Sequence, residues 1–121
     1  MSERRRVSPR GILIADTVLI PLEDGDRAEA LKKMGKFIIA IDLNPLSRTA
    51  RVADITIVDN IVRAMPKLIE EVRNLKKCPR EHLKSILQNY DNDAVLRKML
   101  QIIVRNLEEL ARRGVTISLP K

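Results

Sequence analysis

The chain has 121 residues, of which 45% are apolar, and a formal net charge of +7. This length suits one domain that buries its own core. No stretch approaches the ~20 apolar residues of a membrane helix, and the basic N-terminus lacks the apolar centre of a secretion signal. The composition therefore predicts a soluble, cytoplasmic protein. Aromatic rings, on which single-stranded nucleic acids stack, are nearly absent, which disfavours nucleic acid as a partner despite the charge.

The chain has one cysteine, Cys78, and one histidine, His82. A single cysteine forms no internal disulfide, and we expect no Ser-His-Asp triad around the single histidine. The two side chains could form a thiol–imidazole pair or half a metal site. Two ligands do not complete a zinc site, so we interpret Cys78 as structural and assign no metal ligands.

Short apolar runs alternate with helix-forming segments along the first two thirds of the chain. Residues 1–7 are predicted to form a flexible basic arm, and Ser8-Pro9 has the pattern of a helix start. The predicted strands, rich in β-branched residues, are 17–20, 37–41 and 55–58. The predicted helices are 8–15, 28–34, 44–52 and 60–77, and Pro66 is expected to start or kink the last of them.

This alternation predicts an α/β fold with a parallel sheet covered on both faces. We expect a Rossmann-like three-layer unit with a short parallel sheet over residues 8–78, followed by a helical C-terminal tail over residues 79–121. The last helix, predicted between Asp91 or Asn92 and Gly114, repeats apolar residues three or four apart. That stripe could pack on the sheet or on a second subunit, and the sequence leaves both alternatives open.

The carboxyl ends of the predicted strands are polar. They fall at Glu23–Arg27, Asp42–Asn44 and Asp59–Ile61. Ligands of open parallel sheets bind at these ends, where the following helices begin. The three segments therefore form the candidate site, although Asp and Asn are also the ordinary residues of turns and helix caps.

The segment from Asp42 to Thr49 is the most specific of these. Asp42 could accept hydrogen bonds from ribose or hold a metal ion, and Asn44 is predicted to cap a helix whose first turn suits phosphate. Arg48 offers a forked cation for phosphate oxygens, and Thr49 adds a hydroxyl. The chain has neither a glycine-rich dinucleotide motif nor a P-loop motif, so both of those standard nucleotide folds are disfavoured.

Three strings of the sequence resemble archaeal phosphopantothenate synthetase, also called 4-phosphopantoate–β-alanine ligase. They are Val18–Leu31, Ala40–Ala50 and Ala53–Asn60. The resemblance implies a homodimeric enzyme of coenzyme A biosynthesis that uses ATP and Mg²⁺ to join 4-phosphopantoate to β-alanine through an acyl-adenylate. It also implies ATP contacts at Asp42, Leu43, Asn44, Arg48, Thr49, Asn60 and Ile61. Asp24, Asp26 and Asp59 are candidates for a base or for magnesium, and no catalytic residue is assigned.

Members of that family are about twice as long, so the resemblance is to their C-terminal half only. The missing half would supply further basic residues to the ATP phosphates, where negative charge develops during adenylation. A separate N-terminal half is therefore an expected partner. The alternative function is a non-catalytic nucleotide-binding or dimeric scaffold domain. A basic nucleic-acid binder using Arg4–Arg6 and the Arg63–Lys77 face is a third alternative.

Overall fold

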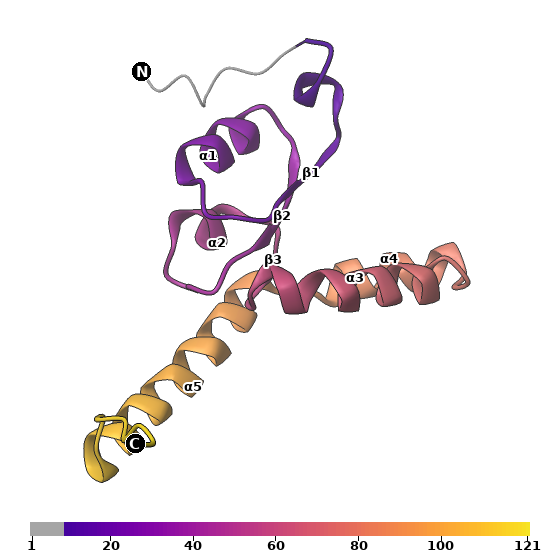
Figure 1. Cartoon of the computed structure of the whole chain (residues 1–121). Coiled ribbons are helices and arrows are strands. Elements are labelled where there is room, and N and C mark those ends of the chain that lie inside the picture. The colour runs from indigo at the N-terminus through magenta and orange to yellow at the C-terminus, as the bar shows by residue number, and fades with distance from the viewer. Residues whose placement is uncertain (1–8) are drawn as a thin grey trace.

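A computed structural model describes residues 9–121 (Figure 1). The predicted arm at 1–7 and the cap residue Ser8 lie outside this range. The elements after the short 3₁₀ turn Ile12–Ile14 are β1 (Thr17–Ile20), α1 (Gly25–Lys33), β2 (Phe37–Ile41), α2 (Arg48–Val52), β3 (Ile55–Ile57), α3 (Ile61–Leu75), α4 (Arg80–Asn89) and α5 (Asn92–Arg113). The helix predicted over 8–15 is thus only that 3₁₀ turn.

The three strands form one parallel sheet in the order β1-β2-β3. Thr17 pairs with Phe37 and Ile20 with Ala40, while Ile39 pairs with Ile55 on the other side of β2. All three predicted strands form, and the α/β prediction with a short parallel sheet and a helical C-terminal tail is confirmed.

Helices α1 and α2 pack against each other over one face of the sheet. Because each strand adds next to the previous one, successive crossovers return on the same side and place both helices together. The core of this layer consists of Ile20, Ala28, Leu31, Ile38, Ala40 and Ala53. On the opposite face Leu19 remains 39% exposed. The expectation that helices cover both faces therefore needs correction, since this second face is covered only in part.

The loop before α2 departs from the prediction. Helix α2 begins at Arg48, and Ser47 is its N-cap, whose hydroxyl accepts from the N–H of Ala50 at 3.0 Å. Asn44 instead accepts from the N–H of Leu46 at 2.9 Å, which forms a local turn. The helix predicted to open at Asn44 therefore starts four residues later, because Ser47 and not Asn44 has its side chain over the first free amides.

The last three helices extend away from the sheet (Figure 1). Ala64 is the one buried residue of α3, and Leu96 the one of α5. Helix α3 starts at Ile61 and runs through Pro66, so Pro66 does not begin the helix, and a kink at Pro66 stays a prediction. Its ring leaves the carbonyl of Val62 without a helical donor, and Val62 is 78% exposed, so water can replace that donor. No helix within residues 9–121 is long and apolar enough to cross a membrane.

One side-chain network fixes the start of α5 to the edge of the sheet. The hydroxyl of Tyr90 accepts from the N–H of Thr56 at 3.1 Å and donates to Oδ1 of Asn92 at 2.8 Å. Asn92 in turn donates its amide to the carbonyls of Ala50 and Ala53, both at 3.1 Å. The unpaired edge of β3 thus gains a side-chain hydrogen-bond partner. The first residue of α5 is held next to the sheet by the same network.

Candidate functional site

Three loops meet at the carboxyl ends of the parallel strands. They are residues 21–24 after β1, 42–47 after β2 and 58–60 after β3. The strand pairing places all three ends at one edge of the sheet. All the segments that the sequence predicts to bind a ligand therefore lie next to the same edge.

Asp42 organises the middle loop. Only 8% of the residue is exposed, and its carboxylate accepts from the N–H of Asn44 at 2.9 Å and from the hydroxyl of Ser47. The same Ser47 oxygen caps α2. Asp42 therefore holds the loop in shape, whereas the neighbouring Leu43 is 62% exposed at the rim.

Arg48 lies between two helices and faces carboxylates. Its guanidinium donates to Asp26 at 3.1 Å and to Glu29 at 3.5 Å, and its side chain is 54% exposed. The hydrogen bond to Asp26 and the charges of Asp26 and Glu29 raise the pKa of Arg48 above its ordinary value. Arg48 is therefore a permanent cation, already oriented, with half of its surface open to a ligand.

Thr49 is fully buried and joins two of the loops. Its hydroxyl accepts from the N–H of Asp24 at 2.9 Å. Asp24 is also the N-cap of α1, where its carboxylate accepts from the N–H of Arg27 at 3.2 Å. Thr49 thus fixes the loop after β1 relative to α2, and its own hydroxyl points into the protein.

The third loop is held by charge and capping. Asn60 caps α3 by accepting from the N–H of Arg63 at 2.8 Å, and Asp59 accepts from Nε of Arg63 at 2.8 Å. The hydrogen bond from Arg63, followed by that from the N–H of Asn60, holds the pKa of Asp59 below its ordinary value. Asp59 therefore stays ionised at neutral pH.

An open pocket of about 210 Å³ lies among these loops. Its walls are mostly apolar, and Glu23, Asp42, Asp59 and Asn60 are its polar lining residues. The sequence-predicted residues Asp42, Leu43, Asn60 and Ile61 line this pocket, together with Pro21, Leu22, Glu23 and Ile41. Asn44, Arg48 and Thr49 lie outside its lining, so the structure divides the predicted site into two neighbouring parts.

Comparison with known proteins identifies the family of this chain. The family model described as "Phosphopantothenate/pantothenate synthetase" matches residues 1–106, which include all three strands and their loops. The chain belongs to this family.

Relatives in the phosphopantothenate synthetase family carry the name 4-phosphopantoate–β-alanine ligase. The chain is 55% identical to those of Thermococcus kodakarensis and Thermococcus onnurineus over 113 residues, and 47% identical to that of Methanosarcina mazei over 109 residues. These matches cover 93%, 93% and 90% of this chain but 43% of each relative. The chain thus spans less than half the length of the curated relatives it matches.

Within residues 9–121 of this family member, no group of three or more His, Cys, Asp or Glu side chains is arranged to hold a metal ion. Asp24, Asp26 and Asp59, the candidates for magnesium or a base, each face an arginine. Cys78 is a free thiol, half-buried, with its sulfur 3.6 Å from the carbonyl of Asn74. These contacts favour the structural interpretation of Cys78.

Sequence reasoning did not single out three residues that shape this candidate site. Gly25 lies against Arg48, Glu29 shares the Arg48 guanidinium, and Arg63 holds Asp59. The spacing of Arg63 four residues after Asp59 at a helix start was a usable signal. The contacts to Arg48 join residues 19 to 23 positions apart on different helices, and no local pattern indicates them.

Proposed function

We propose that this chain forms the ATP-binding part of a 4-phosphopantoate–β-alanine ligase. The observation that carries the proposal is the junction of an apolar pocket with an oriented cation at one edge of the sheet. The pocket has Leu43 and Ile61 as apolar walls, and Arg48 is the first residue of α2, which follows the loop that contains Leu43. The names of the relatives supply the reaction.

The adenosine occupies the pocket between the second and third loops. A flat, largely apolar base suits walls such as Leu22, Leu43 and Ile61, and the ionised carboxylate of Asp59 suits ribose hydroxyls. Asp42 and Asn60 act through the loop shapes that they fix, with Asn44 exposed beside them. A pocket of about 210 Å³ holds the nucleoside portion and leaves the phosphates outside.

The phosphates extend from the pocket towards Arg48. Its guanidinium fork matches phosphate oxygens, and its positive charge stabilises the negative charge that develops on the transferring group. Thr49 contributes by fixing the loop through its bond to Asp24, since its own side chain is buried. Mg²⁺ would enter with ATP and would supply positive charge against the triphosphate.

The reaction has two balanced steps. A carboxylate oxygen of 4-phosphopantoate attacks the α-phosphorus of ATP, and the bond to pyrophosphate breaks, which yields an acyl-adenylate. The amine of β-alanine then attacks the acyl carbon, the bond to AMP breaks, and the nitrogen loses a proton to a base that is not yet assigned. A separate N-terminal half supplies further cations, and the reaction takes place in the cytoplasm.

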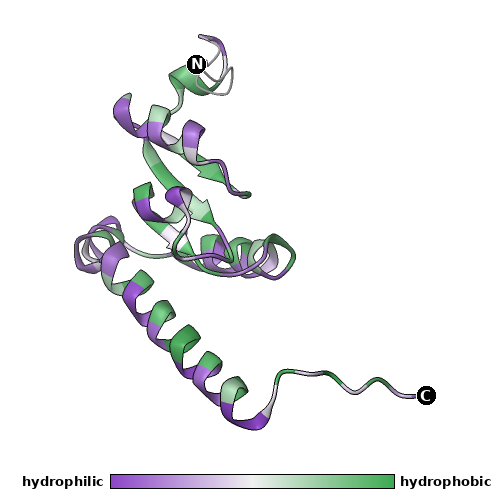
Figure 2. Cartoon of the chain, turned by 90° about the vertical axis from the view of Figure 1, so that its left-hand side faces the viewer, coloured by the Kyte–Doolittle hydropathy of each residue, from purple (hydrophilic) through white to green (hydrophobic). Residues whose placement is uncertain are grey.

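The proposal also includes a homodimer. Helix α5 exposes apolar side chains beyond Leu100, with Ile103 at 37%, Val104 at 51% and Leu107 at 59% exposure. Figure 2 shows apolar turns along this helix, which projects away from the sheet. A second copy packed on this stripe would remove that surface from water.

Calorimetric titration of the chain with ATP and Mg²⁺ tests the proposal. We expect binding in the wild type and at least a tenfold weaker Kd in Arg48→Ala. Arg51→Ala is the matched control, because Arg51 is an exposed arginine of the same helix with the same charge. Equal ATP affinity in the two variants would reject Arg48 as a phosphate ligand, and absence of binding to the wild type would reject the nucleotide site.

A further inference from the structure

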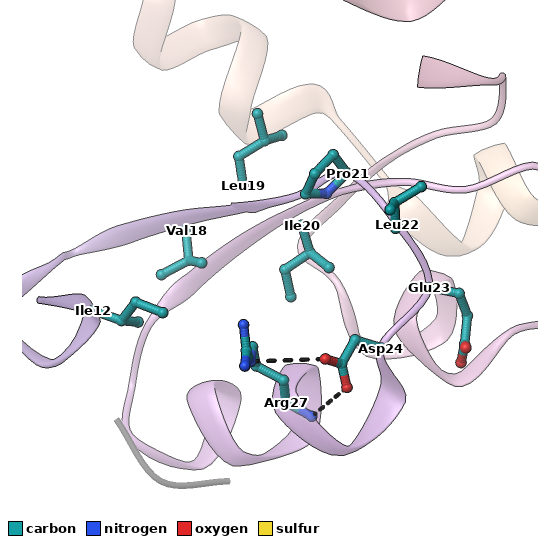
Figure 3. Close-up of a pocket in the computed structure, with 9 residues that line it drawn as sticks. All are labelled: Ile12, Val18, Leu19, Ile20, Pro21, Leu22, Glu23, Asp24 and Arg27. Atoms are coloured by element: carbon teal, nitrogen blue, oxygen red, sulfur yellow. Dashed lines mark hydrogen bonds and ion pairs between the residues drawn. The ribbon is translucent and has the colours of Figure 1, made fainter. Parts of the chain in front are cut away.

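A second pocket, of about 390 Å³, lies beneath β1, next to the nucleotide pocket (Figure 3). The two pockets share Pro21, Leu22 and Glu23 in their linings. A volume of this size falls within the range of about 300–1,000 Å³ found for small-molecule sites. The second pocket contains none of the seven residues that the family resemblance assigns to ATP.

Arg27 supplies the cation of this pocket. It comes from the first turn of α1, and its guanidinium extends towards β1 and the side chains of Val18 and Ile12 (Figure 3). Its Nε is buried and has no hydrogen-bond partner among the described residues. A buried donor without an acceptor is unusual in a folded protein and calls for an explanation.

Asp24 forms an ion pair with Arg27 but no hydrogen bond to its guanidinium, and the arginine side chain is 40% exposed. The closest approach between Nε of Arg27 and Oδ2 of Asp24 is 3.7 Å, which is too long for a hydrogen bond. The other carboxylate oxygen accepts from the backbone N–H of Arg27 as the cap of α1. Glu23 points away from Arg27 in the close-up view. The guanidinium fork therefore retains capacity for an anion.

The walls beside Arg27 are aliphatic. Ile12, Val18 and Ile20 line the same pocket from the 3₁₀ turn and from β1. A ligand that fits here has an anionic end for the guanidinium and a branched apolar body for these side chains.

We propose that this pocket binds the acid substrate, with Arg27 holding the anionic end of a small, branched aliphatic phosphate ester. This assignment rests on the proposed ligase function, for which the substrate is 4-phosphopantoate. Residues 21–23 form a wall shared by both pockets, which places the acid next to the adenosine. The carboxylate of the acid then points across that wall towards the nucleotide phosphates, while the ester phosphate stays on Arg27.

Calorimetry with the complete 121-residue chain tests this assignment, with 4-phosphopantoate, pantoate and inorganic phosphate as separate ligands. We expect Arg27→Ala to weaken 4-phosphopantoate at least tenfold and Arg27→Lys to weaken it less. Arg51→Ala, which removes the same charge elsewhere, should stay within twofold of the wild type. Pantoate and inorganic phosphate should each bind more weakly, because each lacks one of the two features that the pocket recognises.

A second readout does not depend on the alanine variant folding. The Nε–H resonance of Arg27 in the ¹⁵N spectrum of the wild type should shift on addition of 4-phosphopantoate and not on addition of ATP. Equal affinity of Arg27→Ala and Arg51→Ala for 4-phosphopantoate, or an unmoved Arg27 resonance, would overturn the assignment. Inorganic phosphate that binds as tightly as 4-phosphopantoate would overturn the role of the aliphatic walls.

The same titrations separate the two proposals. ATP binding that depends on Arg48, together with 4-phosphopantoate binding that ignores Arg27, would remove this assignment and leave the nucleotide site standing. A chain that binds 4-phosphopantoate through Arg27 but has no affinity for ATP would instead remove the ligase proposal and keep the anion pocket.

Discussion

Gly25 and Arg48 are in such close contact that a side chain on Gly25 has no room. A Cβ at position 25 would lie 2.7 Å from Nε and 2.8 Å from Cβ of Arg48. The Cβ of Arg48 is fixed by the backbone of α2, so rotation of the arginine side chain relieves only part of this overlap. The absence of a side chain on Gly25 therefore allows the starts of α1 and α2 to meet.

Gly25→Ala should consequently destabilise the protein and displace Arg48. Helix propensity favours alanine by about 1 kcal/mol, but overpacking in a tight contact costs about 1–3 kcal/mol, and we expect the overlap to prevail. Urea unfolding should show a lower free energy of unfolding, and calorimetry a weaker ATP complex. The double variant Gly25→Ala with Arg48→Ala should recover part of the lost stability. It removes Nε and Cζ of Arg48, which overlap the new Cβ at position 25, but it keeps the Cβ at position 48. Unchanged stability of Gly25→Ala would mean that the two helices separate at no cost.

Asp26 provides a test of how the cation of this site is used. Its carboxylate and an ATP phosphate would compete for the same guanidinium, and its negative charge repels the triphosphate. Asp26→Asn should therefore tighten ATP by up to about fivefold, since an exposed ion pair contributes ~0.2–1 kcal/mol. Asp93→Asn, which removes an exposed partner of Arg97 on α5, is the control and should leave the ATP affinity unchanged.

The opposite result for Asp26 has a definite meaning. If Asp26→Asn weakens the ATP complex only when Mg²⁺ is present, the carboxylate contributes to magnesium, as the sequence allowed. If it weakens the complex equally with and without Mg²⁺, Asp26 serves mainly to orient Arg48. In either case the competition between carboxylate and phosphate would be rejected.

Much of the fold could be predicted from local sequence. The features that were not predicted depend on contacts between residues that are far apart in the sequence or that meet only after folding. Runs such as Phe37–Ile41 are apolar throughout because both faces of a central parallel strand contact other parts of the protein. These runs predicted the sheet correctly. The start of α2 was misplaced because Asn44 and Ser47 both suit a cap, and the choice depends on a hydrogen bond from Ser47 to the buried Asp42. That bond forms only once β2 and the loop are folded.

The candidate site was likewise predicted only in part. The sequence located Asp42–Thr49 and Asp59–Ile61 next to one edge of the sheet because parallel strands end together. It did not indicate that Thr49 would be buried, or that Arg27 would lie in a second pocket, because both depend on how α1 lies over the sheet. Tertiary packing decides which polar side chains of a loop remain available to a ligand.

Tyr90 is the one tyrosine of a chain without tryptophan, so its ionisation can be followed by ultraviolet absorbance. Burial raises the pKa of its phenol above the ordinary value of 10.0. The folded state therefore holds the phenolic proton more tightly than the unfolded state. The stability from this difference is present below pH 10 and is lost as the pH rises through the folded pKa. A spectral titration should give a midpoint above that of the chain in urea.

Tyr90→Phe should destabilise the protein by about 1–3 kcal/mol, because the buried N–H of Thr56 loses its acceptor and Asn92 loses a donor. Ser85→Ala is the control, since it removes an exposed side-chain hydrogen bond to Asn89 and should change stability by about 0.5 kcal/mol or less. Equal effects of the two substitutions in urea unfolding would mean that α5 is held to the sheet by other contacts.

The proposed homodimer makes the last prediction. Ile103 and Leu107 are four residues apart and share one side of α5, where both are exposed. Leu107→Lys should place a charge in the proposed interface and convert the dimer to a monomer in sedimentation equilibrium. Glu108→Lys is the matched control on the same turn of the helix, and it should leave the dimer intact although it changes the charge more.

The prediction requires that the Leu107→Lys variant is monomeric and still folded. Because Leu107 makes little contact with the rest of its own chain, the circular dichroism of the variant should match that of the wild type at high protein concentration. The unfolding midpoint of the wild type should depend on protein concentration and that of the variant should not, since dissociation is linked to unfolding only in a dimer. A wild type that sediments as a monomer would leave the α5 stripe without a second copy, and the dimer would have to be given up.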